Sequence, residues 1–161
     1  MFGRSRHNLV LIMDVLTVVI VLAALVAIST AIGLFARSRE GRVVVVDGLT
    51  RLAAADLGAD VTYGEFATLV QFSTEFCTKC PATRVLLSRI AGEHPGVAHV
   101  DVDVTHRQDL TQRFNIMQTP TTLVLDDSGA IAARIGGAPK PDAVKTALGI
   151  ALRRDHGHYV I

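Results

Sequence analysis

The chain has 161 residues, of which 50% are hydrophobic, with two cysteines, no tryptophan and a formal net charge of +1 at neutral pH. This length predicts one soluble domain plus an additional segment. The charge balance lacks the basic excess of nucleic-acid-binding proteins, so we expect no nucleic-acid partner.

Residues 1–8 form a short N-terminal tail that carries Arg4 and Arg6, and residues 9–35 are almost wholly apolar. A helix needs about 20 predominantly apolar residues to cross the hydrocarbon core of a membrane. Asp14 lies near one end of the run, where its carboxylate can reach the interface. The sequence therefore predicts one transmembrane helix, 9–35, and a single-pass membrane protein.

Two other interpretations of this apolar run are open. A cleaved signal peptide has an apolar region of about 7–15 residues that ends at an Ala-x-Ala-like site. Ala27-Ile28-Ser29 is similar to such a site, but the apolar run continues to Phe35, which favours an uncleaved anchor. A helix buried in a soluble core is disfavoured, because a small domain has no place for a helix that is apolar on all sides.

The side of the membrane depends on the basic residues that flank the run. Arg4 and Arg6 precede it, and Arg37, Arg39 and Arg42 follow it. An excess of Lys and Arg marks the cytoplasmic side, and here the two sides nearly balance. Because a short basic tail before a long translocated domain is the commoner arrangement, we expect the soluble domain to be extracytoplasmic.

Residues 36–60 are interpreted as a linker and lead-in. The run Val43–Val46 predicts a strand, which the turn signal Asp47-Gly48 would end. The Ala-rich stretch from Leu49 to Asp60 fits either a short helix or an irregular segment.

A strand followed by a helix occupies the middle of the chain, with Cys77 and Cys80 at the junction. Ala67–Phe72 is short and mostly apolar, as expected for a strand that is covered on both faces. Ala82–Ala91 predicts a helix whose inner face carries three apolar residues, Val85, Leu86 and Ile90.

The position of the two cysteines favours redox chemistry. A thiol at a helix N-terminus faces unpaired N–H groups and the positive end of the helix dipole, and Lys79 adds a further positive charge. Both effects favour the nucleophilic thiolate, which we assign to Cys77. Cys80 lies about one helical turn later, so its sulfur can reach that of Cys77. Pro81 fits the first turn, where a missing N–H costs little.

The remaining elements alternate between strands and helices. They are a strand over Val97–Val104, a helix over Gln108–Phe114, strands over Thr121–Leu125 and Ile131–Ile135, a helix from Pro141 with Val144 and Leu148 on its inner face, and a C-terminal tail, 153–161.

The strand before Cys77, the pair Thr119-Pro120, the turn 126–129 and the step Gly136-Gly137 together resemble the thioredoxin superfamily. The resemblance implies an α/β thioredoxin fold over 61–152, a central mixed sheet flanked by helices. The phrase 55–62 is similar to the domain entry of membrane-tethered thioredoxin-like proteins of the TlpA/ResA type.

The resemblance also implies an activity, protein thiol–disulfide oxidoreductase, with Cys77 and Cys80 as the catalytic pair. Pro120 would be cis beside the sulfurs, and Thr119 with Pro120 would bind an extended substrate, while Thr78 and Lys79 support the site. The partners would be a protein disulfide or dithiol substrate and a redox partner that supplies or accepts electrons. We expect no organic cofactor and no resident metal.

Four residues depart from the thioredoxin pattern. Phe76 stands where thioredoxins usually have Trp, and Thr78-Lys79 replaces their Gly-Pro. Gln71 occupies the position of a buried carboxylate that helps move the proton of the second cysteine. Because Gln cannot accept that proton, another base or water must do so, and Glu75 is one candidate. These departures favour a dedicated tethered oxidoreductase over a general cytosolic thioredoxin.

Other roles of the cysteine pair also remain as alternatives. A structural disulfide that closes so short a loop would contribute little stability. A structural zinc site needs four ligands, and only His94, His99 or His106 could join the cysteines. Soft thiolates also select Cu(I), so a copper metallochaperone is the alternative of a different class, and an assembly factor with vestigial cysteines is a third.

Overall fold

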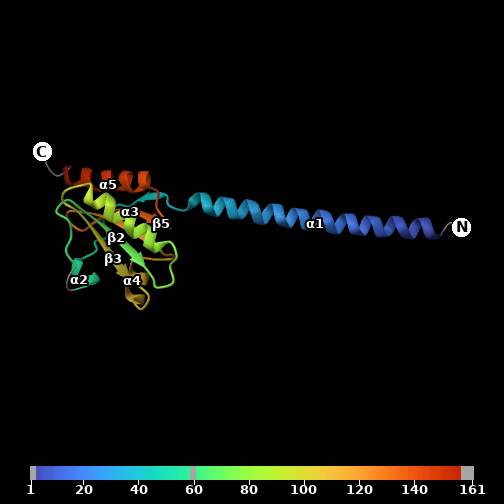
Figure 1. The fold of residues 1–161 in the computed structure, drawn as a ribbon, viewed down its shortest axis with the longest axis horizontal. Helices are drawn as coiled ribbons and strands as arrows, with labels where there is room; N and C mark the ends of the chain where they lie inside the picture. The colour runs from blue at the N-terminus through green and yellow to red at the C-terminus, as the bar shows by residue number, and fades with distance from the viewer. Residues whose placement is uncertain (1–2, 59–60, 157–161) are drawn as a thin grey trace. The chain divides into compact units, whose positions relative to one another are not determined.

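The structure of the protein, a computed structural model, describes residues 3–58 and 61–156. The chain divides into two compact units, Met1–Arg39 and Glu40–Ile161, which are treated separately below (Figure 1). Part of the predicted C-terminal tail, 157–161, lies outside the described residues.

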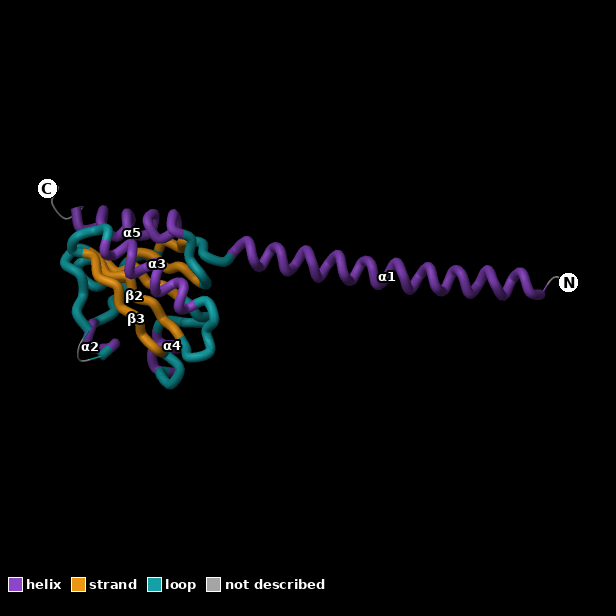
Figure 2. The backbone as a smooth tube through the Cα atoms, in the orientation of Figure 1, coloured by secondary structure: helices purple, strands orange, loops and turns teal. Residues whose placement is uncertain are grey.

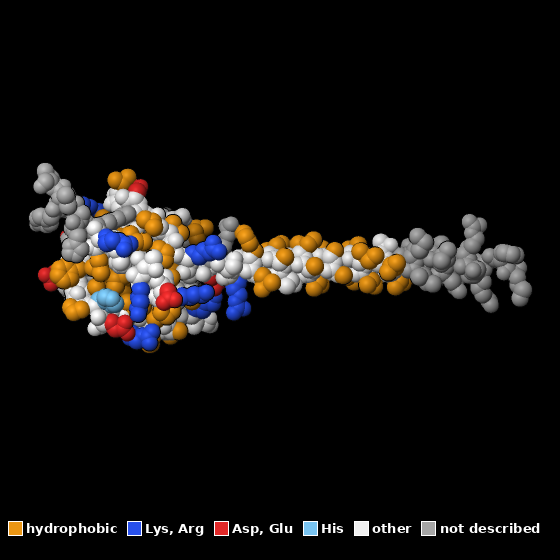
Figure 3. Space-filling view, turned by 90° about the horizontal axis from the view of Figure 1, so that it is seen from above, with side chains coloured by type: hydrophobic (Ala, Val, Ile, Leu, Met, Phe, Trp, Pro, Cys, Tyr) orange, Lys and Arg blue, Asp and Glu red, His pale blue; other side chains and the backbone are white. Residues whose placement is uncertain are grey.

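The first unit is a single helix, α1 (Gly3–Arg39). Its segment Val15–Ser38 has 24 residues and is long and apolar enough to cross a membrane. The hydroxyls of Ser29 and Thr30 donate hydrogen bonds of 2.8 Å to backbone carbonyls one turn earlier, so these polar groups are satisfied within the helix. Most of the visible side chains of this segment are apolar, as Figure 3 shows, and the charged residue Arg37 lies near its C-terminal end. None of this segment is buried, so α1 is not a core helix of its unit.

The second unit is built on one five-stranded sheet of order β1-β5-β4-β2-β3 (Figure 2). The central strand β2 is parallel to β3 and antiparallel to β4, and β5 pairs antiparallel with both β4 and β1. The strands are β1 (Val43–Val45), β2 (Ala67–Ser73), β3 (Val97–Asp103), β4 (Thr121–Asp126) and β5 (Ile131–Gly136). All seven residues of β2 are buried, as its apolar composition predicts.

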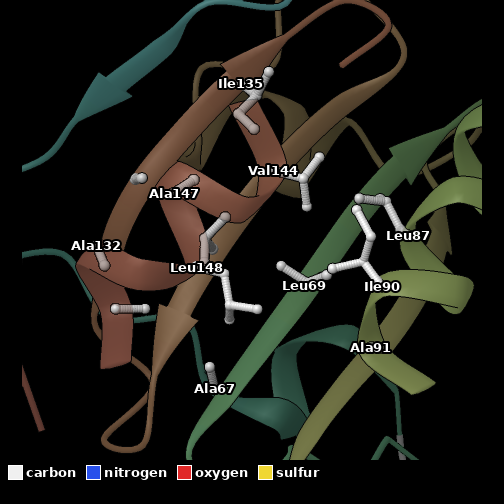
Figure 4. Packing of buried hydrophobic residues seen from close by; sticks show 13 residues of the cluster. Ala67, Leu69, Leu87, Ile90, Ala91, Ala132, Ile135, Val144, Ala147 and Leu148 are labelled. Carbon is white, nitrogen blue, oxygen red and sulfur yellow. The ribbon is translucent and has the colours of Figure 1, made fainter. Parts of the chain in front are cut away.

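Helices cover both faces of this sheet. On one face, α3 (Cys80–Gly92) and α5 (Pro141–His156) run side by side (Figure 1) and pack over Leu69 and Val124. Figure 4 shows Leu87 and Ile90 of α3 and Leu148 of α5 pointing into this core. On the other face, α2 (Ala54–Leu57) and α4 (Gln108–Arg113) belong to a second core. The expected α/β architecture, a mixed central sheet flanked by helices, is confirmed.

The inner face of α3 differs from the expectation at one residue. Val85 is 70% exposed, whereas Leu87 and Ile90 are fully buried and Leu86 is half-buried. The helix begins at Cys80, and the side facing the sheet is set by residues spaced by three and four from that start. The assignment of Val85 to the inner face was therefore wrong, and Leu87 occupies that place.

The predicted linker, 36–60, largely forms part of the second unit. The strand expected over Val43–Val46 is present as β1, and α2 is the short helix expected as one option for the Ala-rich stretch. Leu52 and Leu57 are buried in the core beneath β2, and the Tyr63 hydroxyl donates a hydrogen bond of 2.8 Å to the Leu52 carbonyl. The packed unit thus begins upstream of Val61, the predicted start of the domain.

Candidate active site

The cysteine motif lies where β2 leaves the sheet and α3 begins. Two tight turns carry it, in which the Cys77 N–H donates to the Thr74 carbonyl over 3.1 Å and the Cys80 N–H donates to the Cys77 carbonyl over 3.2 Å. Lys79 is the N-cap of α3, and Cys80 is its first residue. Cys77 therefore precedes the helix instead of occupying its N-terminus, which corrects the expectation from the sequence.

The two sulfurs form a disulfide with an S–S distance of 1.99 Å and a Cα–Cα distance of 5.4 Å. The prediction that the sulfur of Cys80 can reach that of Cys77 is confirmed. The two residues differ in accessibility, because Cys80 is only 3% exposed while Cys77 is half-buried. An incoming thiol can therefore approach the Cys77 sulfur more easily than that of Cys80.

The loop before β4 lies against the cysteine loop. The peptide bond between Thr119 and Pro120 is cis, as the resemblance implied, and Pro120 is buried. The Thr119 hydroxyl lies 3.2 Å from that of Thr74, and the Gly137 N–H donates to the Pro120 carbonyl over 2.8 Å. These contacts bring the predicted residues Thr119 and Pro120 next to the segment that carries Cys77.

Thr78 and Lys79, the two residues between the cysteines, are both exposed. The Lys79 ammonium lies 2.9 Å from the carboxylate of Glu40, and both side chains are about half exposed (54% and 42%). An exposed pair of this kind contributes about 0–1 kcal/mol to stability. The contact ties the active-site turn to the first residue of the second unit.

Gln71 lies beneath the motif and is fully buried. Its side-chain Nε2 donates a hydrogen bond of 3.1 Å to the carbonyl oxygen of Cys80, so Gln71 lies next to the cysteine pair. Among the described residues, its Oε1 has no hydrogen-bond partner. The amide supports the first turn of α3 but has no carboxylate with which to accept a proton.

An ion pair that the sequence did not predict lies beside the disulfide. Asp101 of β3 accepts a hydrogen bond of 2.8 Å from the Ser73 hydroxyl, and its other oxygen binds the guanidinium of Arg84 from α3. Both residues line a cavity of about 310 Å³ together with Cys77 and Cys80. The sequence shows one signal for Asp101, the alternation of polar and apolar residues along β3. In the parallel pairing of β2 with β3, Asp101 is the register partner of Gln71.

The histidines considered as metal ligands lie in other surroundings. His99 contacts the Ser88 hydroxyl over 2.8 Å, and burial lowers the pKa of its imidazole. The His94 ring bonds the Ile90 carbonyl. Within residues 3–58 and 61–156, no three His, Cys, Asp or Glu residues are grouped closely enough to bind a metal ion.

Comparison with known proteins gives the family. The family profile described as Thioredoxin matches residues 49–148. Thioredoxin C-2 of Corynebacterium nephridii is 35% identical over 83 residues, which cover 51% of this chain and 77% of that protein. The chain belongs to the thioredoxin family. Together with the Cys77–Cys80 disulfide, this makes it a thiol–disulfide oxidoreductase.

Other thioredoxins match over similar stretches. A thioredoxin H-type of Oryza sativa subsp. indica is 28% identical over 78 residues, covering 48% of this chain and 63% of that protein. Among solved structures, thioredoxin f from spinach chloroplast has a TM-score of 0.49 and 22% identity, covering 55% of this chain and 78% of that chain. The family match starts at residue 49, so the apolar helix α1 lies outside it.

Proposed function

We propose that this thioredoxin is a membrane-tethered thiol–disulfide oxidoreductase of the TlpA/ResA-like kind, which acts on protein substrates through a mixed disulfide. One observation carries the proposal. The Cys77–Cys80 disulfide has one accessible and one buried sulfur, and it lies beside the loop of Thr119 and Pro120. An accessible attacking sulfur with a protected resolving sulfur is the arrangement that two-step exchange requires.

In the reducing direction, the Cys77 thiolate attacks one sulfur of a substrate disulfide and expels the other substrate sulfur as a thiolate. The Cys80 thiolate then attacks the Cys77 sulfur of the mixed disulfide, which releases the second substrate thiolate and leaves the Cys77–Cys80 disulfide. Two electrons pass from the cysteine pair to the substrate, which takes up two protons. A redox partner must then reduce the pair again, and the reverse sequence oxidises substrate thiols.

The substrate would bind in a groove next to Cys77. This groove has a volume of about 430 Å³, and its lining includes Thr74, Phe76, Ile116, Met117, Gln118 and Thr119. Phe76 and Met117 are 86% and 83% exposed, although both are large and apolar. Exposed apolar side chains at the rim of a site favour contact with apolar residues of a partner protein. We therefore expect an extended substrate segment to lie between Phe76 and the loop of Thr119.

The tether is the apolar segment Val15–Ser38. Only Arg39 separates it from Glu40, the first residue of the second unit, so the connecting segment is short. A tethered domain acts at a membrane, so its substrates would be proteins whose disulfides or thiols are exposed there. We place the domain outside the cytoplasm, where disulfides persist and a reducing role needs electrons delivered across the membrane.

Trapping in cells tests the redox function. In the Cys80→Ala variant, the mixed disulfide at Cys77 cannot be resolved, so substrates should remain covalently bound until a reductant is added. The matched control Cys77→Ala should trap much less, because it lacks the accessible sulfur. Absence of thiol-sensitive adducts in Cys80→Ala cells would contradict the proposal, and stoichiometric copper in the reduced, purified protein would favour a metallochaperone instead.

Fractionation tests the tether. The full chain should stay with membranes after carbonate washing, because a spanning helix is held by burial of its whole apolar surface. A membrane-impermeant thiol reagent, applied to intact cells after mild reduction, should label Cys77. Labelling that appears only after lysis would place the domain in the cytoplasm, and release of the protein by carbonate would reject the anchor.

A further inference from the structure

The resolving cysteine must lose its proton inside the protein. Cys80 is only 3% exposed, and its thiol becomes nucleophilic only after deprotonation. Gln71 is buried and bonds the Cys80 carbonyl, but its amide cannot accept a proton. The proton of Cys80 must therefore pass to water or to another base, and the cavity that Cys80 lines contains candidate bases.

Three carboxylates line the cavity next to Cys80, and they differ in burial and in hydrogen bonding. Asp103 is exposed to bulk water, and its carboxylate accepts hydrogen bonds from the Thr105 backbone and hydroxyl. Glu75, the candidate suggested by the sequence, is also exposed. Only 15% of the Asp101 side chain is exposed, so Asp101 is the carboxylate most protected from bulk water.

The strand pairing places Asp101 on the same face of the sheet as Gln71. In the parallel pairing of β2 with β3, Asp101 is the register partner of Gln71 and therefore points to the same side of the sheet. Ser73 lies two residues after Gln71 on that side, and its hydroxyl holds one Asp101 oxygen. β3 thus carries the Asp101 carboxylate at the register position where β2 carries the Gln71 amide.

From this arrangement, and resting on the proposed function, we propose that Asp101 accepts the proton of Cys80 during the resolving step. The cavity of about 310 Å³ exceeds the roughly 30 Å³ that a water molecule occupies, so water can connect the two groups. The S–H bond of Cys80 breaks, its proton passes through water to Asp101, and the thiolate attacks the Cys77 sulfur. The departing substrate thiolate or bulk water takes up the proton afterwards.

Several charged groups face Asp101 and affect its role. Arg84 binds one of its oxygens and so orients the carboxylate. His99 lies on the same strand, where burial lowers the pKa of its imidazole and leaves it mostly neutral at pH 7. Glu75 and Asp103 lie at the exposed rim of the cavity. Among these groups, Asp101 combines a carboxylate with low exposure.

The resolving step can be measured with an aromatic disulfide such as dithionitrobenzoate and the reduced full chain in detergent. Attack by Cys77 releases the first coloured thiolate, and attack by Cys80 on the mixed disulfide releases the second. In Asp101→Asn, the first phase should keep its rate, while the second should slow by about tenfold or more at pH 7. The loss should shrink as the pH rises, because hydroxide then removes the thiol proton.

Matched variants separate proton transfer from a structural role. Asp103→Asn and Glu75→Gln remove carboxylates from the same cavity and should leave the second phase unchanged, while Asp101→Glu should retain most of the rate. An unchanged second phase in Asp101→Asn overturns the proposal. So does an equal, pH-independent slowing in Asp101→Asn and Arg84→Gln, because that result assigns the ion pair a structural role only.

A measurement on the unmodified protein applies even if Asp101→Asn does not fold. The carboxyl ¹³C resonance of Asp101 should titrate differently when the cysteine pair is reduced than when it is oxidised, because only the reduced protein has a Cys80 proton to share. Identical titrations overturn the proposal. Failure of the proposed function looks different, because the wild-type protein itself would then show no second phase and no trapped substrate.

Discussion

The hydroxyl oxygens of Thr74 and Thr119 lie 3.2 Å apart, and their contact joins the loop that carries Cys77 to the loop that carries Pro120. The two residues are 45 positions apart in the chain, so only the folded sheet brings them together. This hydrogen bond fixes the distance between the reactive sulfur and the loop against which a substrate segment would lie.

Removing that contact should loosen the site. Thr74→Val keeps the shape of the side chain but loses the hydroxyl, and the free energy of unfolding should fall by about 1 kcal/mol. Urea denaturation measures this change. Thr146→Val, on an exposed position of α5, is the control and should change stability by less than about 0.5 kcal/mol. Equal stability of Thr74→Val and the wild type would show that the hydrogen bond contributes nothing measurable.

The order of thiol reactivity follows from burial. In the reduced protein at neutral pH, a limiting amount of alkylating reagent should modify Cys77 before Cys80, because Cys80 is only 3% exposed. Peptide mass spectrometry of the alkylated protein identifies the modified residue. The Cys77→Ala variant provides the comparison, since its remaining thiol should react much more slowly. Preferential modification of Cys80 would contradict the assignment of attacking and resolving sulfurs.

A carboxylate at position 71 should make stability depend on pH. Gln71 is fully buried, so in Gln71→Glu the folded state disfavours the charged carboxylate and its pKa lies above the unfolded value of about 4.3. Relative to the wild type, stability should therefore be retained below that pH and lost as the pH rises towards the folded pKa. The loss is about 1.4 kcal/mol for each pH unit between the two values.

Denaturation curves of Gln71→Glu and the wild type, recorded from about pH 4 to about pH 8, measure that loss. Gln108→Glu, at an exposed position of α4, supplies the control for an added surface charge. A constant difference between Gln71→Glu and the wild type across the range would mean that the new carboxylate finds a solvated environment.

Tyr63 should limit stability in alkaline solution. Burial, together with the nearby Asp56 carboxylate, raises the pKa of Tyr63 from 10.0 to about 12. The phenol therefore ionises more easily in the unfolded chain, and its contribution to the free energy of unfolding should decline as the pH rises from 10.0 to about 12. Tyr63→Phe should lack this part of the decline, at a cost of about 1 kcal/mol near neutral pH for the lost hydrogen bond to Leu52. Parallel slopes for the two proteins would contradict the raised pKa.

The parts of the site that were predictable from the sequence are those in which short motifs specify local structure. Cys77 and Cys80 are three residues apart, and that spacing predicts that their sulfurs can reach each other. Pro120 was recognisable from its position before an apolar strand. Asp101 and Arg84 were not recognisable, because their meeting depends on the register of β3 against β2 and on the rotation of α3.

The rotation of α3 about its axis also explains why the assignment of Val85 to the inner face was wrong. An apolar repeat fixes the period of a helix but fixes its phase poorly when apolar residues are adjacent, as in Val85, Leu86 and Leu87. The start of α3 at Cys80 sets the phase, and the start depends on the turns that close the disulfide loop. In the predicted lead-in, Leu52 and Leu57 are too far apart in the sequence to form a recognisable apolar pattern. Their burial in the core is therefore visible only in the structure.

The strand that supplies Asp101 is also the outer strand of the sheet. β3 has seven residues, and in the strand order β1-β5-β4-β2-β3 it pairs, within the described part of the chain, on one side only. Long open edges recruit strands of other chains and promote aggregation, and charged side chains on the edge oppose this. His99, Asp101 and Asp103 alternate along β3, so the Asp101 carboxylate also helps to keep one copy of the domain from pairing with another.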